Sequence, residues 1–185
     1  MGIAAMEHLR NAHQLEELDL WGCANIKDDA MFYVAQLQKL QDLCVEGTQV
    51  TNVGLAQVMH LPELRHLHIC ALQITESDIE HLKSLPSLTD LYIGNNYEIG
   101  DTQVAQIATF KRLKVLQLHR TSVTDAGLMH LQKLVNLEHL DLNDTQVTDA
   151  GLEHLGVLKK LRVLNVEHTK VTAAGVAKVQ DELAS

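Results

Sequence analysis

Histidine, cysteine and aspartate side chains gather in one part of the sequence in a pattern that could bind a metal or carry a nucleophile. His66, His68 and Cys70 alternate with other residues, which would place them on one face of a β-strand. Asp42 and Cys44 hold the matching places in a similar segment 24 residues earlier. Such ligands suit zinc, and a cysteine beside a histidine suits nucleophilic catalysis.

The rest of the sequence favours neither chemistry. Neighbouring side chains on one face of a sheet lie about 5–7 Å apart, whereas zinc needs ligands at about 2.0–2.3 Å. The sequence contains no G-x-S-x-G motif, no Walker phosphate-binding loop and no H-E-x-x-H motif. Each of these motifs is the sequence signature of a known catalytic or phosphate-binding site. We therefore predict no catalytic residue, no metal site, no cofactor and no enzymatic activity, although adventitious zinc or nickel binding stays open.

The segment that holds these residues is one of seven repeats. The repeats from Leu113 and Leu137, LKVLQLHRTSVTDAGLMHLQKLVN and LEHLDLNDTQVTDAGLEHLGVLKK, agree at 13 of 24 positions. Leucines open the repeats at steps of 24 or 25 residues, at Leu15, Leu40, Leu64, Leu88, Leu113, Leu137 and Leu161. Self-similarity at this period predicts a stack of equal structural units.

Each repeat predicts one strand, one turn and one helix. The opening L-x-x-L-x-L alternates buried and outward positions, as in a short strand. The ninth place is Thr, Asn or Cys except at Leu72, and we expect this side chain to bond the backbone at the turn. Apolar residues three apart then indicate a helix. The expected N-caps of these helices are Thr51, Thr75, Thr124, Thr148 and Thr172. Four glycines in the first turns are expected to leave room for neighbouring helices: Gly54, Gly127, Gly151 and Gly175.

These motifs resemble the leucine-rich-repeat proteins, with the signature L-x-x-L-x-L-x-x-(N/C/T)-x-(L/V/I), from about Met6 to Leu183. The V-T-D-A-G-L helix opening is similar to bacterial members and to the cysteine-containing subclass. The first repeat, LEELDLWGCANIKDDAM, resembles that subclass most, and its eukaryotic members often serve as substrate receptors of ubiquitin ligases. The resemblance implies an α/β fold, a right-handed solenoid or horseshoe with a parallel concave sheet of about seven strands and convex α-helices.

The domain boundaries follow from the repeats. Residues 1–14 are expected to form an N-terminal cap or a partial repeat helix, because MEHLRNAHQL, from Met6, matches LEHLGVLKKL, from Leu152. A natural cap and a fragment of a longer array both fit this start. Residues 15–185 hold the seven repeats, and we expect the last helix to act as the C-terminal cap.

The outward residues between the strand leucines are the predicted binding surface, because the scaffold does not constrain them. Aromatic and arginine side chains often anchor interfaces, and charged groups steer a partner. The predicted partner-binding residues are Trp21, Glu46, His66, His68, Tyr92, His119, Arg120 and Asp141. Protonation of the histidines would remove negative charge from this face, so binding of a basic partner is expected to weaken at acidic pH.

Charge and composition narrow the partner class. The net charge is −9, from 15 basic and 24 acidic residues. This balance argues against nucleic acid, whose phosphates need Lys and Arg, and favours a basic protein or peptide. No apolar run of 18 residues occurs, so we predict no membrane span. The scattered Cys23, Cys44 and Cys70 favour a reducing compartment, and we expect a cytoplasmic monomer.

The sequence leaves two classes of function. The first is a protein–protein interaction module that recognises a protein or peptide through the acidic, histidine-containing concave face. The second is a structural or assembly segment of a longer protein that docks through its ends or convex helices. A substrate-receptor part of a ubiquitin-ligase-like or effector protein is a further alternative.

Overall fold

The structure is a computed structural model that describes residues 6–72 and 74–184. The chain divides into two compact units, Met1–Tyr92 (unit 1) and Ile93–Ser185 (unit 2), and each is described by itself. The predicted cap segment 1–14 is described only from Met6, whose side chain is buried. The role of this segment as a cap stays a prediction.

Both units are built on short parallel strands that follow one another in chain order. Unit 1 contains β1 (Glu17–Asp19), β2 (Asp42–Cys44), β3 (His66–His68) and β4 (Asp90–Tyr92). Unit 2 contains β5 (Val115–Gln117), β6 (His139–Asp141) and β7 (Val163–Asn165). Within each unit the register joins equal places of successive repeats, as between Leu43 and Leu67 or between Leu116 and Leu140. The seven predicted strands are confirmed.

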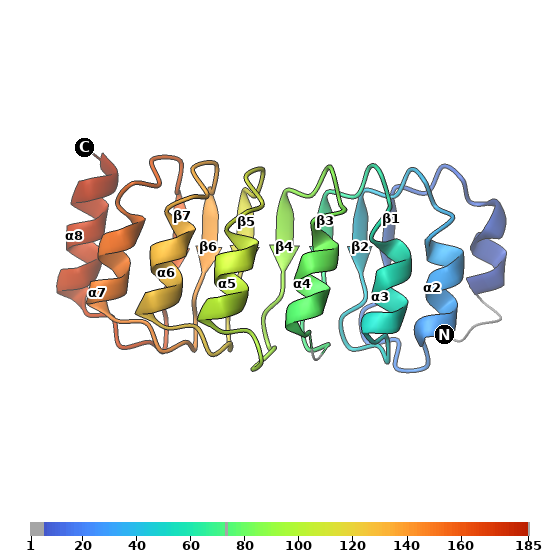
Figure 1. Cartoon of the computed structure of the whole chain (residues 1–185), viewed down its shortest axis with the longest axis horizontal. Helices are drawn as coiled ribbons and strands as arrows, with labels where there is room; N and C mark the ends of the chain where they lie inside the picture. Colours follow the sequence, from blue (N-terminus) through green and yellow to red (C-terminus); the bar gives the residue numbers. More distant parts are fainter. Residues whose placement is uncertain (1–5, 73, 185) are drawn as a thin grey trace. The chain divides into compact units, whose positions relative to one another are not determined.

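A helix follows each strand and lies on one side of it (Figure 1). Unit 1 has the 3₁₀ helix η1 (Glu7–Asn11), then α2 (Asp28–Val34), α3 (Asn52–Val58) and α4 (Glu76–Leu82). Unit 2 has α5 (Asp101–Ile107), α6 (Asp125–Leu131), α7 (Asp149–Leu152), the 3₁₀ helix η2 (Glu153–Leu155) and α8 (Ala173–Ala184). All but α8 span at most two turns, so packing must stabilise them.

The core of each unit lies between its strands and its helices. The strand leucines are fully buried in the interior of the stack, as at Leu67 and Leu140, and so are the helix leucines, as at Leu128. The first and third residues of each strand point the other way, and we call their side chains the strand face. Full burial of one such leucine stabilises the fold by about 1.5–3 kcal/mol.

The predicted polar turn after each strand is present in five repeats. The ninth-place threonine donates its hydroxyl hydrogen to the carbonyl of the residue that directly follows the strand, three places earlier, at 2.6–2.7 Å for Thr48, Thr121, Thr145 and Thr169. Asn96 donates to the Ile93 carbonyl in the same way at 2.9 Å. These bonds close the turn that leads each strand into its helix.

An aspartate at the start of one helix holds the start of the next helix. The carboxylate of Asp125 accepts hydrogen bonds from the backbone N–H and the hydroxyl of Thr148, both at 2.7 Å. The same pair of bonds, which we call the Asp–Thr staple, recurs in Asp28–Thr51, Asp101–Thr124 and Asp149–Thr172. The threonines were predicted as N-caps, whereas their bonds to the preceding repeat were not predicted.

The staple explains the recurrent glycine of the helix openings. A side-chain Cβ added at Gly54 would lie 2.5 Å from Oδ1 of Asp28, and one at Gly127 would lie 2.5 Å from Oδ1 of Asp101. Added Cβ atoms at Gly151 and Gly175 would also collide with the stapling carboxylates. The glycines therefore let each aspartate approach the next helix, which refines the expectation that they leave room between helices.

The hydrogen bonds of one staple also change the pKa of its aspartate, Asp149. The two bonds from Thr172 lower the pKa of Asp149 below its ordinary value. A carboxylate whose pKa is lower in the folded state stabilises the fold above the ordinary carboxyl pKa. That contribution is lost as the pH falls through the lowered pKa. The Asp149–Thr172 staple is thus a neutral-pH interaction that acid removes.

Replacing Asp125 by alanine is expected to lower the free energy of unfolding by about 1–3 kcal/mol, because two hydrogen bonds to a carboxylate are lost. Chemical denaturation followed by circular dichroism measures this change. Asp181, an exposed acid on α8, is the control, and its replacement by alanine should change the free energy by less than about 0.5 kcal/mol. Equal losses in the two variants would show that the staple contributes nothing.

Candidate functional site

The strand face of unit 1 brings together acidic, imidazole and phenol side chains from three neighbouring strands. Asp42 lies on β2, His66 and His68 lie on β3, and Asp90 and Tyr92 lie on β4. The register places Asp42 beside His66 and His68 beside Tyr92. Three predicted site residues, His66, His68 and Tyr92, thus form one cluster with two carboxylates.

His66 lies between the two carboxylates. Its Nδ1 is 3.1 Å from Oδ2 of Asp42, and its Nε2 is 3.1 Å from Oδ2 of Asp90. A neutral imidazole carries one N–H, so both contacts are hydrogen bonds only when the ring is doubly protonated. In the neutral ring one of the two carboxylates loses its partner. The protonation state of His66 therefore sets how much negative charge this surface presents.

His68 and Tyr92 form a stacked pair beside these carboxylates. Their ring centroids are 3.8 Å apart and the ring planes differ by 5°. His68 Nε2 also lies 3.6 Å from Oδ1 of Asp42. Burial, followed by the charges of Asp90 and Asp42, raises the pKa of Tyr92, so its hydroxyl keeps its proton at neutral pH. A rigid aromatic surface with a polar tip next to carboxylates is suited to hold a cationic side chain.

The nearby thiol is a poor nucleophile. Burial, opposed by a bond to the Glu46 backbone and supported by the charge of Asp19, raises the pKa of Cys44 to about 11. Because the thiolate is the reactive form of cysteine, Cys44 stays a thiol beside His68. None of Cys23, Cys44 and Cys70 takes part in a disulfide bond within the described part of the chain. Among residues 6–72 and 74–184, no group of three His, Cys, Asp or Glu side chains could hold a metal ion.

Next to the strand face of unit 2, a second arrangement surrounds His119. The amide nitrogen of Asn95 lies 3.1 Å from His119 Nε2, and it donates a hydrogen bond there when the ring proton is on Nδ1. This nitrogen is buried without a hydrogen-bond partner in the described part of the chain, and it faces Oδ2 of Asp141 at 3.9 Å. Asp141 is fixed by the Asn143 N–H, which donates to Oδ1 at 2.9 Å. The predicted residues His119 and Asp141 therefore lie together.

Arg120 follows His119 in a left-handed backbone conformation. Its φ is +52°, a region that disfavours residues other than glycine by about 1–2 kcal/mol. Its exposed guanidinium Nε lies 3.3 Å from Oδ2 of Asp144, which has φ of +55°. The predicted Arg120 is thus already paired with an acid, and a partner would have to compete with Asp144 for it.

Trp21 and Glu46 lie outside both clusters. Trp21 is 69% exposed at the end of β1, where its backbone N–H bonds to Asp19. Glu46 follows β2 and is half-buried. Alternation along the strands also places Asp42 and Asp90 on the outward surface, but neither is among the predicted partner-binding residues. Their role becomes visible only through their contacts with His66.

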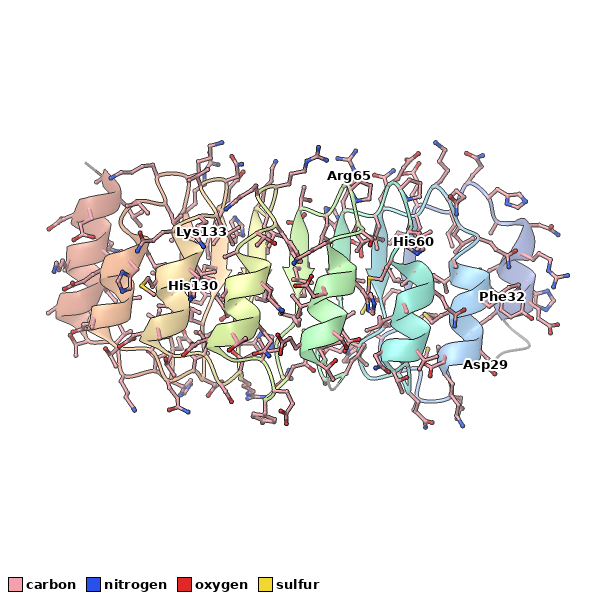
Figure 2. The ribbon with its side chains drawn as sticks, in the orientation of Figure 1. Asp29, Phe32, His60, Arg65, His130 and Lys133 are labelled. Atoms are coloured by element: carbon pink, nitrogen blue, oxygen red, sulfur yellow. The ribbon has the colours of Figure 1, made fainter. Side chains whose placement is uncertain are left out.

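The opposite side of each unit, formed by the helices, carries different chemistry (Figure 2). Asp29 and Phe32 are exposed on α2, and His130 lies on α6 (Figure 2). Phe32 is 57% exposed and packs edge-on against Tyr33. This surface has single apolar side chains, which are ordinary on protein surfaces. No helix of the described residues is long and apolar enough to cross a membrane.

Gly94 lies directly beneath the His119 ring, because an added Cβ there would collide with that ring. Replacing Gly94 by alanine is expected to displace His119 and lower the free energy of unfolding by about 1–3 kcal/mol. Thermal unfolding and the NMR shifts of the His119 ring measure both effects.

Gly100 is the matched control in the same unit, since a Cβ there has its nearest neighbours at 3.8 Å. Its replacement by alanine should leave the His119 signals unchanged. Unchanged His119 signals in the Gly94→Ala variant would contradict the described packing.

Comparison with known proteins supports the fold. A family model described as Leucine Rich repeat matches residues 133–156. No curated protein matches the sequence significantly. Among solved structures, an internalin (inlF) from Listeria monocytogenes str. 4b F2365 aligns at a TM-score of 0.56 and 22% identity, over 92% of this chain and 60% of that chain.

A second internalin from the same organism, internalin C2 (inlC2), aligns at a TM-score of 0.61 and 18% identity. The alignment covers 97% of this chain and 80% of that chain. At these identities the likeness concerns the fold, and this chain spans 60% of the length of the inlF structure. The matching repeat model and the shared fold show that the chain contains a leucine-rich repeat at residues 133–156 and has the fold of leucine-rich-repeat proteins.

Proposed function

We propose that the chain is a protein–protein interaction module that binds a basic protein or peptide through its strand face. Leucine-rich-repeat proteins commonly act in this way, whereas the class of the partner is our inference. The main observation in support of a basic partner is the cluster of Asp42, Asp90 and Tyr92 around the imidazoles of β3. Here carboxylates lie beside a stacked aromatic pair on residues that the core does not require.

Charge and chemistry support a cationic partner. The chain carries a net charge of −9, which attracts basic partners over distances of about one Debye length. The carboxylate of Asp42 is about one-third exposed, so a lysine or arginine of the partner could reach it. The Tyr92 ring would then lie close enough to contribute a cation–π contact.

The remaining expectations stand as parts of this proposal. We infer a non-enzymatic monomer that works without a cofactor, and the raised pKa of the Cys44 thiol supports the absence of a cysteine nucleophile. Three cysteines that form no disulfide bond among the described residues favour a reducing compartment such as the cytoplasm. Docking through the helices, as in an assembly segment, is the second candidate, and the exposed Phe32 and Met129 support it.

Selection of binding peptides tests the proposal. Peptides selected from a random 12-residue library against the full chain are expected to be rich in Lys and Arg. Their affinity should fall at least about tenfold in an Asp42→Asn/Asp141→Asn variant, which removes one charge from the strand face of each unit. Isothermal titration calorimetry measures the affinities.

The control removes the same charges elsewhere. Asp29→Asn/Asp181→Asn takes one exposed acid from the helices of each unit and should keep the affinity within about twofold. Selected peptides without excess basic residues would contradict the cationic partner. Equal losses in the two variants would contradict the strand face as the binding surface.

Acidic pH is expected to weaken the binding of the selected basic peptides. Protonation of His66 and His68 adds positive charge next to Asp42, so imidazolium and peptide compete for the same carboxylates. We expect the affinity to fall as the pH goes from about 7.5 to about 5.5, with a smaller fall in a His66→Gln variant. An affinity that stays constant over this range would disprove the competition.

A further inference from the structure

The basic residues of the chain are concentrated in two short segments of unit 2. Unit 1 has 5 basic and 13 acidic residues, whereas unit 2 has 10 basic and 11 acidic residues. Six of these ten basic residues lie in the segments KRLK, from Lys111, and KKLR, from Lys159. Each segment surrounds the leucine that opens its repeat, Leu113 or Leu161. The positive charge of unit 2 therefore recurs at one place of the repeat.

This place is the loop that leads from a helix to the next strand. The first basic segment lies between α5 and β5, the second lies between η2 and β7, and the loop from α6 to β6 lies between the two. These loops follow the edge of unit 2 at the top of Figure 1, and Lys133 of the middle loop lies toward the same edge (Figure 2). We call the six exposed cations of the outer two loops the basic edge: Lys111, Arg112, Lys114, Lys159, Lys160 and Arg162.

Hydrogen bonds tie the three loops into one surface. The Glu138 N–H donates to the Lys114 carbonyl at 2.8 Å, and the Arg162 N–H donates to the Glu138 carbonyl at 2.8 Å. The Asn136 amide donates to the Lys111 carbonyl at 2.9 Å. Neighbouring strands lie about 4.8 Å apart, so the two basic loops are about 10 Å apart, a distance that about three residues of an extended peptide span.

Neutral oxygen atoms hold two of the lysines in place. Lys160 Nζ donates to Oδ1 of Asn136 at 2.8 Å. Lys111 Nζ donates to the backbone carbonyls of Ala108, at 3.0 Å, and of Lys133, at 3.2 Å. Amide and carbonyl oxygens carry no net charge, so these bonds orient the ammonium groups without cancelling their charge. The basic edge thus presents positive charge at fixed positions.

Acidic side chains offset only part of this charge. The middle loop contains Glu138, whose Oε1 is 4.0 Å from Nζ of Lys114. An exposed pair at this distance is weak. Glu182 of α8 lies near the third loop, where its backbone carbonyl accepts a hydrogen bond from Lys159. Two nearby acids therefore face six cations.

The repeat scaffold does not require these cations. The equivalent loops of unit 1, residues 36–41, 60–65 and 84–89, contain two basic residues, Lys39 and Arg65. Lys39 pairs there with the carboxylate of Glu63 at 2.6 Å. Unit 1 therefore forms the same loops with few, partly neutralised charges, so the basic edge is a feature of unit 2 beyond the needs of the fold.

We propose that the basic edge is a second interaction surface, which binds a segment of a partner protein rich in Asp and Glu. Guanidinium and ammonium groups donate charge-assisted hydrogen bonds to carboxylates. A short acidic segment contacts the edge alone, whereas a long polyanion such as a nucleic acid or an anionic bilayer is repelled by the net charge of −9. This surface is separate from the strand face, and it goes beyond the proposed function and does not depend on it.

Fluorescence anisotropy with a fluorescein-labelled peptide of eight Glu residues tests the proposal on the full chain. We expect binding that weakens at least about fivefold between 0.05 M and 0.3 M salt. NMR shifts of the unaltered chain should concentrate on residues 109–114, 133–138 and 157–162. Absence of binding at low salt, or shifts elsewhere in the chain, would overturn the proposal.

Charge removal gives the matched comparison. Lys114→Gln/Lys160→Gln/Arg162→Gln is expected to lower the affinity for the peptide at least about tenfold. The control, which removes three exposed cations outside the basic edge, should change it less than about threefold: Lys27→Gln/Lys170→Gln/Lys178→Gln. Circular dichroism checks that both variants keep the fold. Equal losses in the two variants would refute the basic edge as the binding surface.

Other occupants are separate outcomes of the same experiment. A 20-nucleotide oligothymidylate, or vesicles that contain phosphatidylserine, should bind more weakly than the peptide. Tighter binding of either one, lost in the first variant, would replace the acidic protein segment with that polyanion. A molecular mass that rises with concentration in light scattering, and no longer does so in the first variant, would assign the basic edge to a second copy of the chain and overturn the proposal.

Discussion

The hydrogen bonds from one helix start to the next are the constraint on which the repeats of each unit depend. Hydrophobic burial is not directional, and the repeats present nearly the same leucines to one another, so burial alone would tolerate small shifts between them. The carboxylate of the Asp–Thr staple accepts hydrogen bonds from two donors at fixed positions, and it lies against a glycine that has no side chain to block it. It therefore fixes both the distance and the register of neighbouring short helices, whose first N–H groups need partners.

The register of the repeats also determines which side chains meet on the strand face. His66 can touch carboxylates at both ring nitrogens only because β2, β3 and β4 are aligned place by place. The same alignment stacks His68 on Tyr92. Interactions along the helix edge and chemistry on the opposite face are thus two results of one repeat period.

The sequence predicted the elements because the period of 24 or 25 residues constrains every repeat at once. The strand leucines and the threonines at the helix starts are confirmed in their predicted places. The polar turn is confirmed in five of the six repeats for which it was predicted. The staple was not predicted, because Asp125 next to Thr124 looks like an ordinary first-turn acid until its neighbour in the next repeat is placed.

The candidate site was predicted in part. Alternation placed His66, His68, Tyr92, His119 and Asp141 on the outward surface, and the structure gathers them into two clusters. The sequence pattern did not select Asp42 and Asp90, because the importance of a carboxylate depends on which side chains the neighbouring strands bring to it. Trp21 was chosen for its residue type, and it lies outside both clusters. Residue type alone was therefore a weaker guide than the pairing of strands.

The central functional claim is that a basic ligand binds the strand face, and NMR mapping tests it most directly. A peptide rich in Lys and Arg would be added to the isotope-labelled full chain, and the shifts of all assigned amides would be followed. The account predicts that shifts concentrate on β2, β3, β4, β5 and β6 and spare the helices from α2 to α8. Shifts concentrated on the helices, with the strands unchanged, would contradict it.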